Sequence, residues 1–144
     1  MDNDLRQLGE ELVTTAARIV RWMPTDGFTL SLAATRLLAR LLDNGPTRIS
    51  DLATQERCSQ PTITNHVKRL ETAGLVARAT DPHDLRAWMI DLTPAGHQRL
   101  AELRSTLGNN VQPYLIGLSK RDLKALREGI EVMQRLIAVD KLPG

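Results

Sequence analysis

Polar and cationic side chains recur at helical spacing in TITNHVKRLETAGL, residues 62–75. On a helix that advances about 100° per residue, Ile63, Val67 and Leu70 fall on one side and mark a buried face. Asn65 and Lys68 project from the opposite side. Amide groups bind base edges in a DNA major groove, and cations reach the phosphates. The spacing therefore predicts a short recognition helix, although the same polar face also fits a merely solvated helix.

The residues on either side complete a helix-turn-helix pattern. PTRISDLATQER, residues 46–57, predicts a support helix with Thr47 as its N-cap. Ser59 is a suitable N-cap for the recognition helix, and Pro61 falls in its first turn, where a missing N–H costs nothing. Because such patterns also occur in protein-interaction modules, the two helices alone leave both interpretations open.

A predicted hairpin follows the recognition helix directly. LVARAT, residues 75–80, and WMIDLT, residues 88–93, alternate like strands, and the Asp-Pro of DPHDLRA initiates the turn between them. Arg86 at the tip is predicted to enter a minor groove. Asp84 cannot favour DNA by charge, so we expect it to hold Arg86 or to brace the loop backbone. This succession makes the motif a winged helix-turn-helix and favours DNA binding.

Amphipathic helices are predicted at both ends of the chain. The first has an apolar stripe that ends at Pro24, and a second helix is expected within residues 28–45. Thr93-Pro94 begins another helix, for which a break or kink is expected near residues 109–113. The last helix starts with a capping pair, Ser119 and Asp122. Packing of the two stripes on each other within one chain is the alternative, but the small middle domain offers little surface to cover both, so we expect a two-fold dimer. The predicted dimer contacts are Leu5, Leu8, Leu12, Leu123, Leu126, Ile130, Met133 and Ile137.

The predicted fold is therefore mainly α, a winged helix-turn-helix with a small β-hairpin wing and N- and C-terminal dimerisation helices. The predicted parts are residues 1–24, an N-terminal dimerisation helix; residues 29–93, the winged DNA-binding domain; and residues 94–144, the C-terminal dimerisation helices.

Composition narrows the function further. The chain has 144 residues, a net charge of +2 and one cysteine, Cys58, which excludes an intramolecular disulfide. The acidic N-terminus does not resemble a signal peptide, and no apolar run approaches a membrane span, so a cytoplasmic protein without a membrane partner is expected.

The three histidines lack metal-ligand spacing and no nucleophile has a matching base, which predicts no metal, no cofactor and no enzyme activity. Oxidation of Cys58 would disturb the recognition helix, but a buried, inert cysteine is commoner.

The whole chain resembles the MarR family of transcriptional regulators. The resemblance is carried by ISDLATQERCSQPTITNHVKRLETAGLVAR and by the wing DPHDLRAWMIDLTPAG, which is similar to the family's Asp-Pro-x-Asp-x-Arg turn. Leu85 departs from the pattern, since many relatives carry a basic residue there. We assign DNA contacts to Arg48, Ser59, Gln60, Pro61, Thr62, Thr64, Asn65, Lys68, Arg69, Asp84 and Arg86.

The resemblance also implies a repressor that a small phenolic or anionic compound releases from DNA. The implied ligand pocket lies where dimer helices meet the winged domain, and Trp22, Met23 and Arg40 are its candidate residues, although they also fit plain core and rim positions. The prediction is thus a homodimer that binds double-stranded DNA at a near-palindromic operator. The alternative is a winged-helix dimerisation or protein-interaction module that does not bind DNA.

Overall fold

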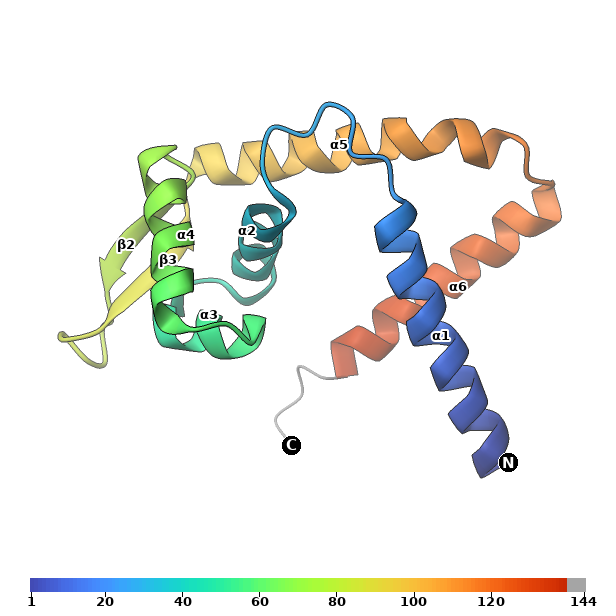
Figure 1. The fold of residues 1–144 in the computed structure, drawn as a ribbon, viewed down its shortest axis with the longest axis horizontal. Coiled ribbons are helices and arrows are strands. Elements are labelled where there is room, and N and C mark those ends of the chain that lie inside the picture. Colours follow the sequence, from blue (N-terminus) through green and yellow to red (C-terminus); the bar gives the residue numbers. More distant parts are fainter. Residues whose placement is uncertain (140–144) are drawn as a thin grey trace. The chain divides into compact units, whose positions relative to one another are not determined.

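The computed structural model describes residues 1–139 (Figure 1). The elements follow in the order α1 (Asp2–Trp22), α2 (Leu32–Asn44), β1 (Thr47–Arg48), α3 (Ile49–Glu56), α4 (Gln60–Thr72), β2 (Val76–Thr80), β3 (Trp88–Leu92), α5 (Pro94–Ile116) and α6 (Lys120–Val139). They belong to two compact units. Thr25–Leu107 is the winged unit, and Met1–Pro24 with the described residues from Gly108 onward is the terminal unit.

The core of the winged unit is aliphatic. Leu37 and Leu38 of α2, Leu52 of α3, Ile63 of α4 and Ile90 of β3 are almost fully buried. Helix α2 begins later than the sequence pattern suggested because Ser31 caps it, its Oγ accepting a hydrogen bond from the Ala34 N–H at 3.1 Å. These buried side chains hold α2, α3 and α4 against the sheet and so fix which face of each helix remains outside.

The two predicted strands are confirmed, and a third was missed. The sheet is antiparallel in the order β1-β3-β2, with Thr47 opposite Ile90 and Val76 opposite Leu92. Strand β1 has two residues, so its sequence carries no alternation and only pairing with β3 defines it. The prediction of Thr47 as a helix N-cap was wrong, because its Oγ1 donates to the Gly45 carbonyl at 2.9 Å and α3 starts at Ile49.

Helix α5 starts as predicted but does not break. Thr93 caps it, accepting a hydrogen bond from the Gly96 N–H at 3.1 Å. A Cβ on Gly96 would stand 2.1 Å from the carbonyl oxygen of Leu75, the residue before β2, so only glycine permits this close approach of α5. Of the break or kink predicted near residues 109–113, the break is absent, since the helix is continuous through this stretch. Pro113 lies in the last turn, where the lost backbone hydrogen bond does not prevent the helix from reaching Ile116.

The winged unit extends past residue 93. Leu100 and Leu103 of α5 are buried, and residues 94–107 belong to this unit rather than to the terminal one. The first half of α5 therefore completes the core around which the helix-turn-helix is built.

The terminal unit holds few of its apolar side chains inside. Trp22 of α1 packs edge-on against Tyr114 of α5, with ring centroids 4.9 Å apart. The Ser119 hydroxyl accepts a hydrogen bond from the Asp122 N–H at 3.1 Å, which confirms the predicted cap of α6. None of the eight predicted dimer contacts is buried in this single chain. Large apolar side chains that are exposed in this unit include Leu5, Leu8, Val13, Ile19, Val20, Ile116, Leu126, Ile130, Val132, Leu136 and Ile137.

Among the described helices, none combines the length and the apolar character needed to cross a membrane.

Candidate nucleic-acid interface

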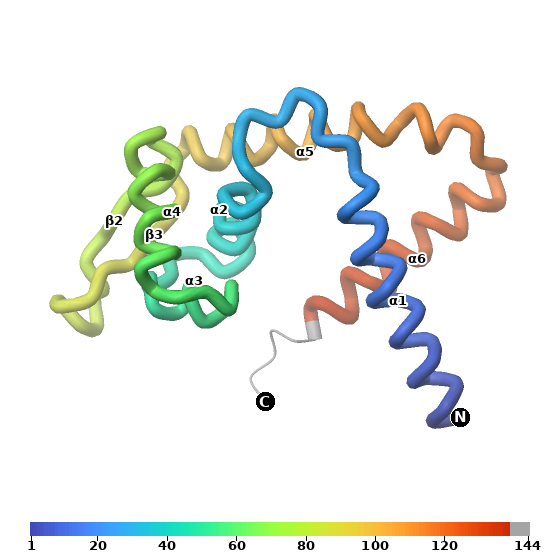
Figure 2. Tube along the Cα trace, in the orientation of Figure 1, coloured from blue at the N-terminus to red at the C-terminus, as the bar shows by residue number. Residues whose placement is uncertain are grey.

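A tight turn joins α3 to α4 and sets the angle of the second helix (Figure 2). Arg57 adopts the left-handed conformation with φ 54°, and the Cys58 N–H returns to the Ala53 carbonyl at 3.0 Å. Such a left-handed residue followed by a returning N–H satisfies the last carbonyls of a helix and stops it. The predicted helix-turn-helix is present, with residues 57–59 as its turn.

The start of α4 is held by the cap that the sequence predicts. Ser59 accepts a hydrogen bond from the Thr62 N–H at 3.3 Å, and the two hydroxyl oxygens lie 2.8 Å apart. Pro61 lies in the first turn. Ser59, Gln60, Pro61 and Thr62 are all exposed. This end of the helix therefore presents small polar groups on a rigid, capped backbone.

The two faces of α4 divide as the helical wheel predicted. Ile63 and Val67 are each 1% exposed, and Leu70 is 3% exposed. Asn65, Lys68 and Arg69 are exposed, whereas Thr64 and His66 are half-buried at the edges of the buried stripe. None of the described part of the chain covers the outward face, so its amide and two cations are available to an external partner.

Asp84 braces the hairpin loop. The Arg86 N–H donates to Asp84 Oδ1 at 3.1 Å, and Arg86 Nε lies 3.6 Å from the same oxygen. The Ala87 N–H donates to the Asp84 carbonyl at 3.0 Å, closing the turn. Asp84 thus both braces the loop and accompanies Arg86, whose side chain is 96% exposed.

An ion pair at the base of the wing escaped the sequence analysis. Arg48 Nε donates to Asp81 Oδ2 at 2.7 Å, and Asp81 Oδ1 accepts the His83 N–H at 2.8 Å. The His83 N–H and the Arg48 guanidinium both lower the pKa of Asp81, which is buried, and the same pair raises the pKa of Arg48. Asp81 was visible in the sequence as the first acid of DPHDLR, but its partner lies 33 residues away.

Three further ion pairs connect the elements of the winged unit. Arg78 Nε donates to Glu71 Oε1 at 2.7 Å and so links β2 to α4. Glu56, at the end of α3, receives both Arg36 and Arg40 from α2. These contacts hold the recognition helix and its support against the rest of the unit.

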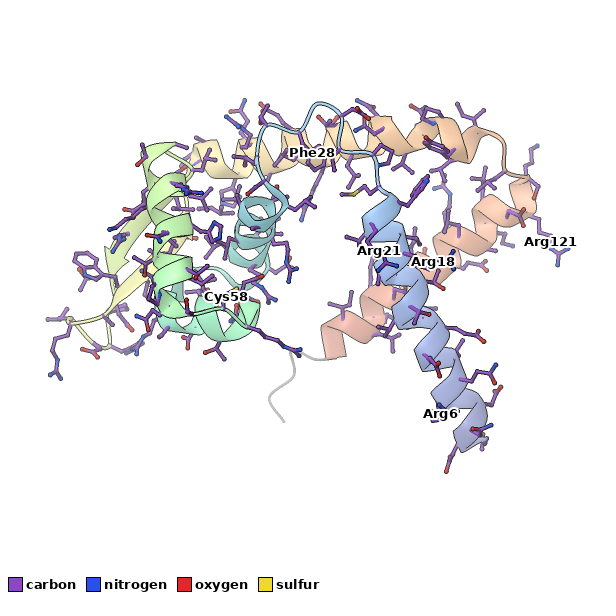
Figure 3. All side chains as sticks on the ribbon, viewed as in Figure 1. Arg6, Arg18, Arg21, Phe28, Cys58 and Arg121 are labelled. Atoms are coloured by element: carbon purple, nitrogen blue, oxygen red, sulfur yellow. The ribbon has the colours of Figure 1, made fainter. Side chains whose placement is uncertain are left out.

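The three predicted ligand residues have separate local environments. Arg40 bonds to Glu56 and donates to the Gln55 carbonyl at 3.0 Å. Trp22 lines a hollow on α1 with Thr15, Arg18 and Ile19. Met23 follows directly and is half-buried. Arg18 and Arg21 extend from the same helix (Figure 3).

Cys58 lies in the turn between α3 and α4 and is exposed (Figure 3). The commoner expectation of a buried cysteine was therefore wrong. Its sulfur lies 3.3 Å from the Glu56 carbonyl.

Known proteins match this arrangement. A model of the MarR family matches residues 30–88, which cover α2 through the start of β3. The HTH-type transcriptional repressor IacR of Pseudomonas putida is 30% identical over 98 residues, 68% of this chain and 59% of the relative. The HTH-type transcriptional regulator YdgG of Bacillus subtilis is 30% identical over 100 residues, 68% of this chain and 66% of the relative. The chain belongs to the MarR family.

Solved structures share the fold of this chain. A MarR family protein from Bacillus stearothermophilus matches with a TM-score of 0.70 at 19% identity, covering 96% of this chain and 98% of that one. The transcriptional regulator Tm0710 of Thermotoga maritima matches with a TM-score of 0.65 at 25% identity, covering 95% and 96%. The curated relatives are longer than the matched stretch, which spans 59% and 66% of the first two.

Within this MarR-family fold the predicted DNA contacts fall into two groups. One follows the outward face of α4, from Gln60 to Arg69. The other lies on the wing and at its base, where Arg48, Gln60 and Arg86 line one groove. The second group brings together residues that are far apart in the sequence, and it adds Ser50 and Trp88 to them.

Proposed function

We propose that this chain is a sequence-specific, DNA-binding regulator of transcription that acts as a cytoplasmic homodimer. The observation that carries the proposal is the division of α4 into a buried apolar face and an exposed polar face. Ile63 and Val67 anchor the helix inside, while Asn65 and Lys68 stay outside on a capped, rigid backbone. An outward amide suits adenine in a major groove, and the neighbouring cations suit phosphates. The wing supplies Arg86 as a second contact, for a minor groove.

The proposed homodimer is supported by the apolar surface of the terminal unit. The exposed residues of α1 and α6 repeat at helical spacing, and a single chain gives them no cover within the described residues. A two-fold interface buries such a stripe against its own copy. It also sets two recognition helices about one helical turn of DNA apart, roughly 34 Å, which requires a near-palindromic operator.

The proposed regulation is repression that a small phenolic or anionic ligand relieves, with Arg40 as its contact in the winged unit. The relative IacR is itself named a transcriptional repressor. Arg40 is a suitable contact because it holds the end of α3 through Glu56 and Gln55. An anion that draws the guanidinium away would loosen the support helix. Such a ligand needs only to favour one arrangement of the two recognition helices over another.

Selection of duplexes from a random pool tests the DNA-binding proposal directly. We expect recovery of a near-palindromic site whose binding weakens steeply as salt rises, because several phosphates release counterions. Lys68→Ala should reduce the slope of log affinity against log salt by about 0.9. Lys124→Ala, which removes an exposed cation from α6, is the matched control and should leave the slope unchanged. Recovery of no preferred duplex would favour the interaction module instead.

A further inference from the structure

Trp88 occupies an unusual position in the wing. Its side chain points to the same face of β3 as Ile90 and Leu92, because alternate residues of a strand share a face. Ile90 and Leu92 are buried in the core, whereas Trp88 is 52% exposed. The hairpin therefore extends beyond the core, and its inner face continues outward as a large aromatic ring that the described residues leave about half exposed.

The ring does not face open solvent on all sides. It borders a groove of about 230 Å³ that is lined by Arg48, Ile49, Ser50, Gln60, Arg86, Ala87 and Trp88. The lining thus comes from the end of β1, the first turn of α3, the first residue of α4 and the wing. It is continuous with the outward face of α4 through Gln60 and with the wing tip through Arg86.

The charge of this groove suits a phosphodiester. Two arginines, Arg48 and Arg86, line it, and the carboxylates paired with them, Asp81 and Asp84, are not among its lining residues. Ser50 adds a hydroxyl, and the first turn of α3 adds backbone N–H groups without helical partners. The deoxyribose between two phosphates presents an apolar edge, which an indole ring covers well.

We propose that this groove takes one sugar–phosphate segment of the duplex, with the Trp88 indole packed on a deoxyribose beside the phosphate held by Arg48, Ser50 and Gln60. This rests on the proposed DNA binding and assigns Trp88 and Ser50 to it as further contacts. Trp88 is neutral, so its contribution to affinity does not depend on counterion release. Arg86 on the same wing contributes through charge.

Fluorescence isolates this contact because the chain has only two tryptophans. Trp22→Phe retains an aromatic partner for Tyr114 and leaves Trp88 as the sole indole. In that variant, titration with a duplex recovered by the selection should change the Trp88 emission. The change should saturate at the same duplex concentration as the gel shift. An emission that stays constant while the duplex binds would overturn the proposal.

Affinity variants give an independent readout. Trp88→Val keeps a strand-forming residue but removes the ring, and should weaken binding roughly tenfold with an unchanged salt slope. Trp88→Phe should recover most of this loss, because it restores an aromatic surface. Met89→Val, on the other face of the same strand, is the matched control and should bind like the unaltered protein. Arg86→Ala should instead reduce the slope of log affinity against log salt by about 1.

Three results would contradict the proposal. The first is that Trp88→Val binds the duplex as tightly as the unaltered protein. The second is that Trp88→Phe recovers none of the affinity lost in Trp88→Val. The third is that the salt slope of Trp88→Val falls as far as that of Arg86→Ala. A protein that binds duplex but is indifferent to Trp88 overturns this inference alone. A protein that binds no duplex overturns the proposed function as well.

Discussion

The two units of this chain treat their apolar residues in opposite ways. In the winged unit, leucine, isoleucine and valine side chains from four helices and the sheet bury one another almost completely. In the terminal unit, α1 has no buried residue at all, and α6 leaves Ile130 and Ile137 exposed. A row of exposed apolar side chains at helical spacing marks an interaction surface rather than a finished core. The core of the winged unit is thus complete in one chain, whereas we propose that a partner completes the terminal unit.

The largest expected effect is the loss of that partner. Ile130→Glu places a charge in the middle of the apolar row of α6, and a two-fold interface would bury it twice. We expect the dimer to weaken at least about a hundredfold, since each unpaired buried charge costs several kcal/mol. Sedimentation measures this. Arg135→Glu, on the opposite face of α6, is the control and should remain dimeric. A monomeric unaltered protein would refute the comparison itself.

A pair of leucine truncations sharpens the contrast between the units. Leu38→Ala removes a fully buried side chain of the winged unit and should lower the free energy of unfolding by about 2–5 kcal/mol. That loss should not depend on protein concentration. Leu126→Ala acts through the proposed dimer, so its effect on the free energy of unfolding should be largest where the unaltered protein is dimeric and should shrink as dilution separates the chains. Urea denaturation at two protein concentrations measures the free-energy loss of each variant. If the losses of Leu38→Ala and Leu126→Ala depended equally on protein concentration, the contrast between the two units would be wrong.

Much of the winged unit was predictable because its signals are local. The cap at Ser59, the proline at position 61 and the stripe of Ile63, Val67 and Leu70 lie within a few residues of one another. Each local preference agreed with the final fold. The exposed apolar stripes of α1 and α6 were predictable for the same reason, since helical spacing alone determines them.

The features that the sequence did not reveal depend on contacts between distant segments. Strand β1 exists because Thr47 and Arg48 pair with β3, more than 40 residues later. The Thr47 hydroxyl consequently turns to Gly45 instead of capping α3. Asp81 meets Arg48 only after the wing has folded back. The groove beside Trp88 likewise appears only when β1, α3, α4 and the wing come together.

DNA contacts provide a smaller test within the winged unit. Asn65→Ala should relax the preference at one operator position by about 1–3 kcal/mol, because the amide reads a base edge. Arg69→Ala should weaken binding to all sequences alike, because a phosphate contact carries no sequence information. Competition gel shifts with single-position operator variants measure both. Unchanged discrimination at every position would remove Asn65 from the base-reading set.

The smallest expected effect concerns the base of the wing at low pH. The His83 N–H and Arg48 hold the pKa of Asp81 below its ordinary value of about 3.9. A carboxyl whose pKa is lowered by folding stabilises the fold at any pH above its pKa in the unfolded chain. That stabilisation is lost as the pH falls through its pKa in the folded chain. The wing should therefore loosen only below about pH 4.

Trp88 lies on the wing and reports this change in the Trp22→Phe variant. Its emission should shift below about pH 4, before the helical circular dichroism is lost, and the shift should disappear in Asp81→Asn. Asp84→Asn leaves the pair of Arg48 and Asp81 intact and should retain the shift. If Asp81→Asn shows the same acid transition, a different carboxyl controls the wing. The ion pair of Arg48 and Asp81 would then stabilise the wing without controlling its response to pH, because protonation of Asp81 would not cause the transition.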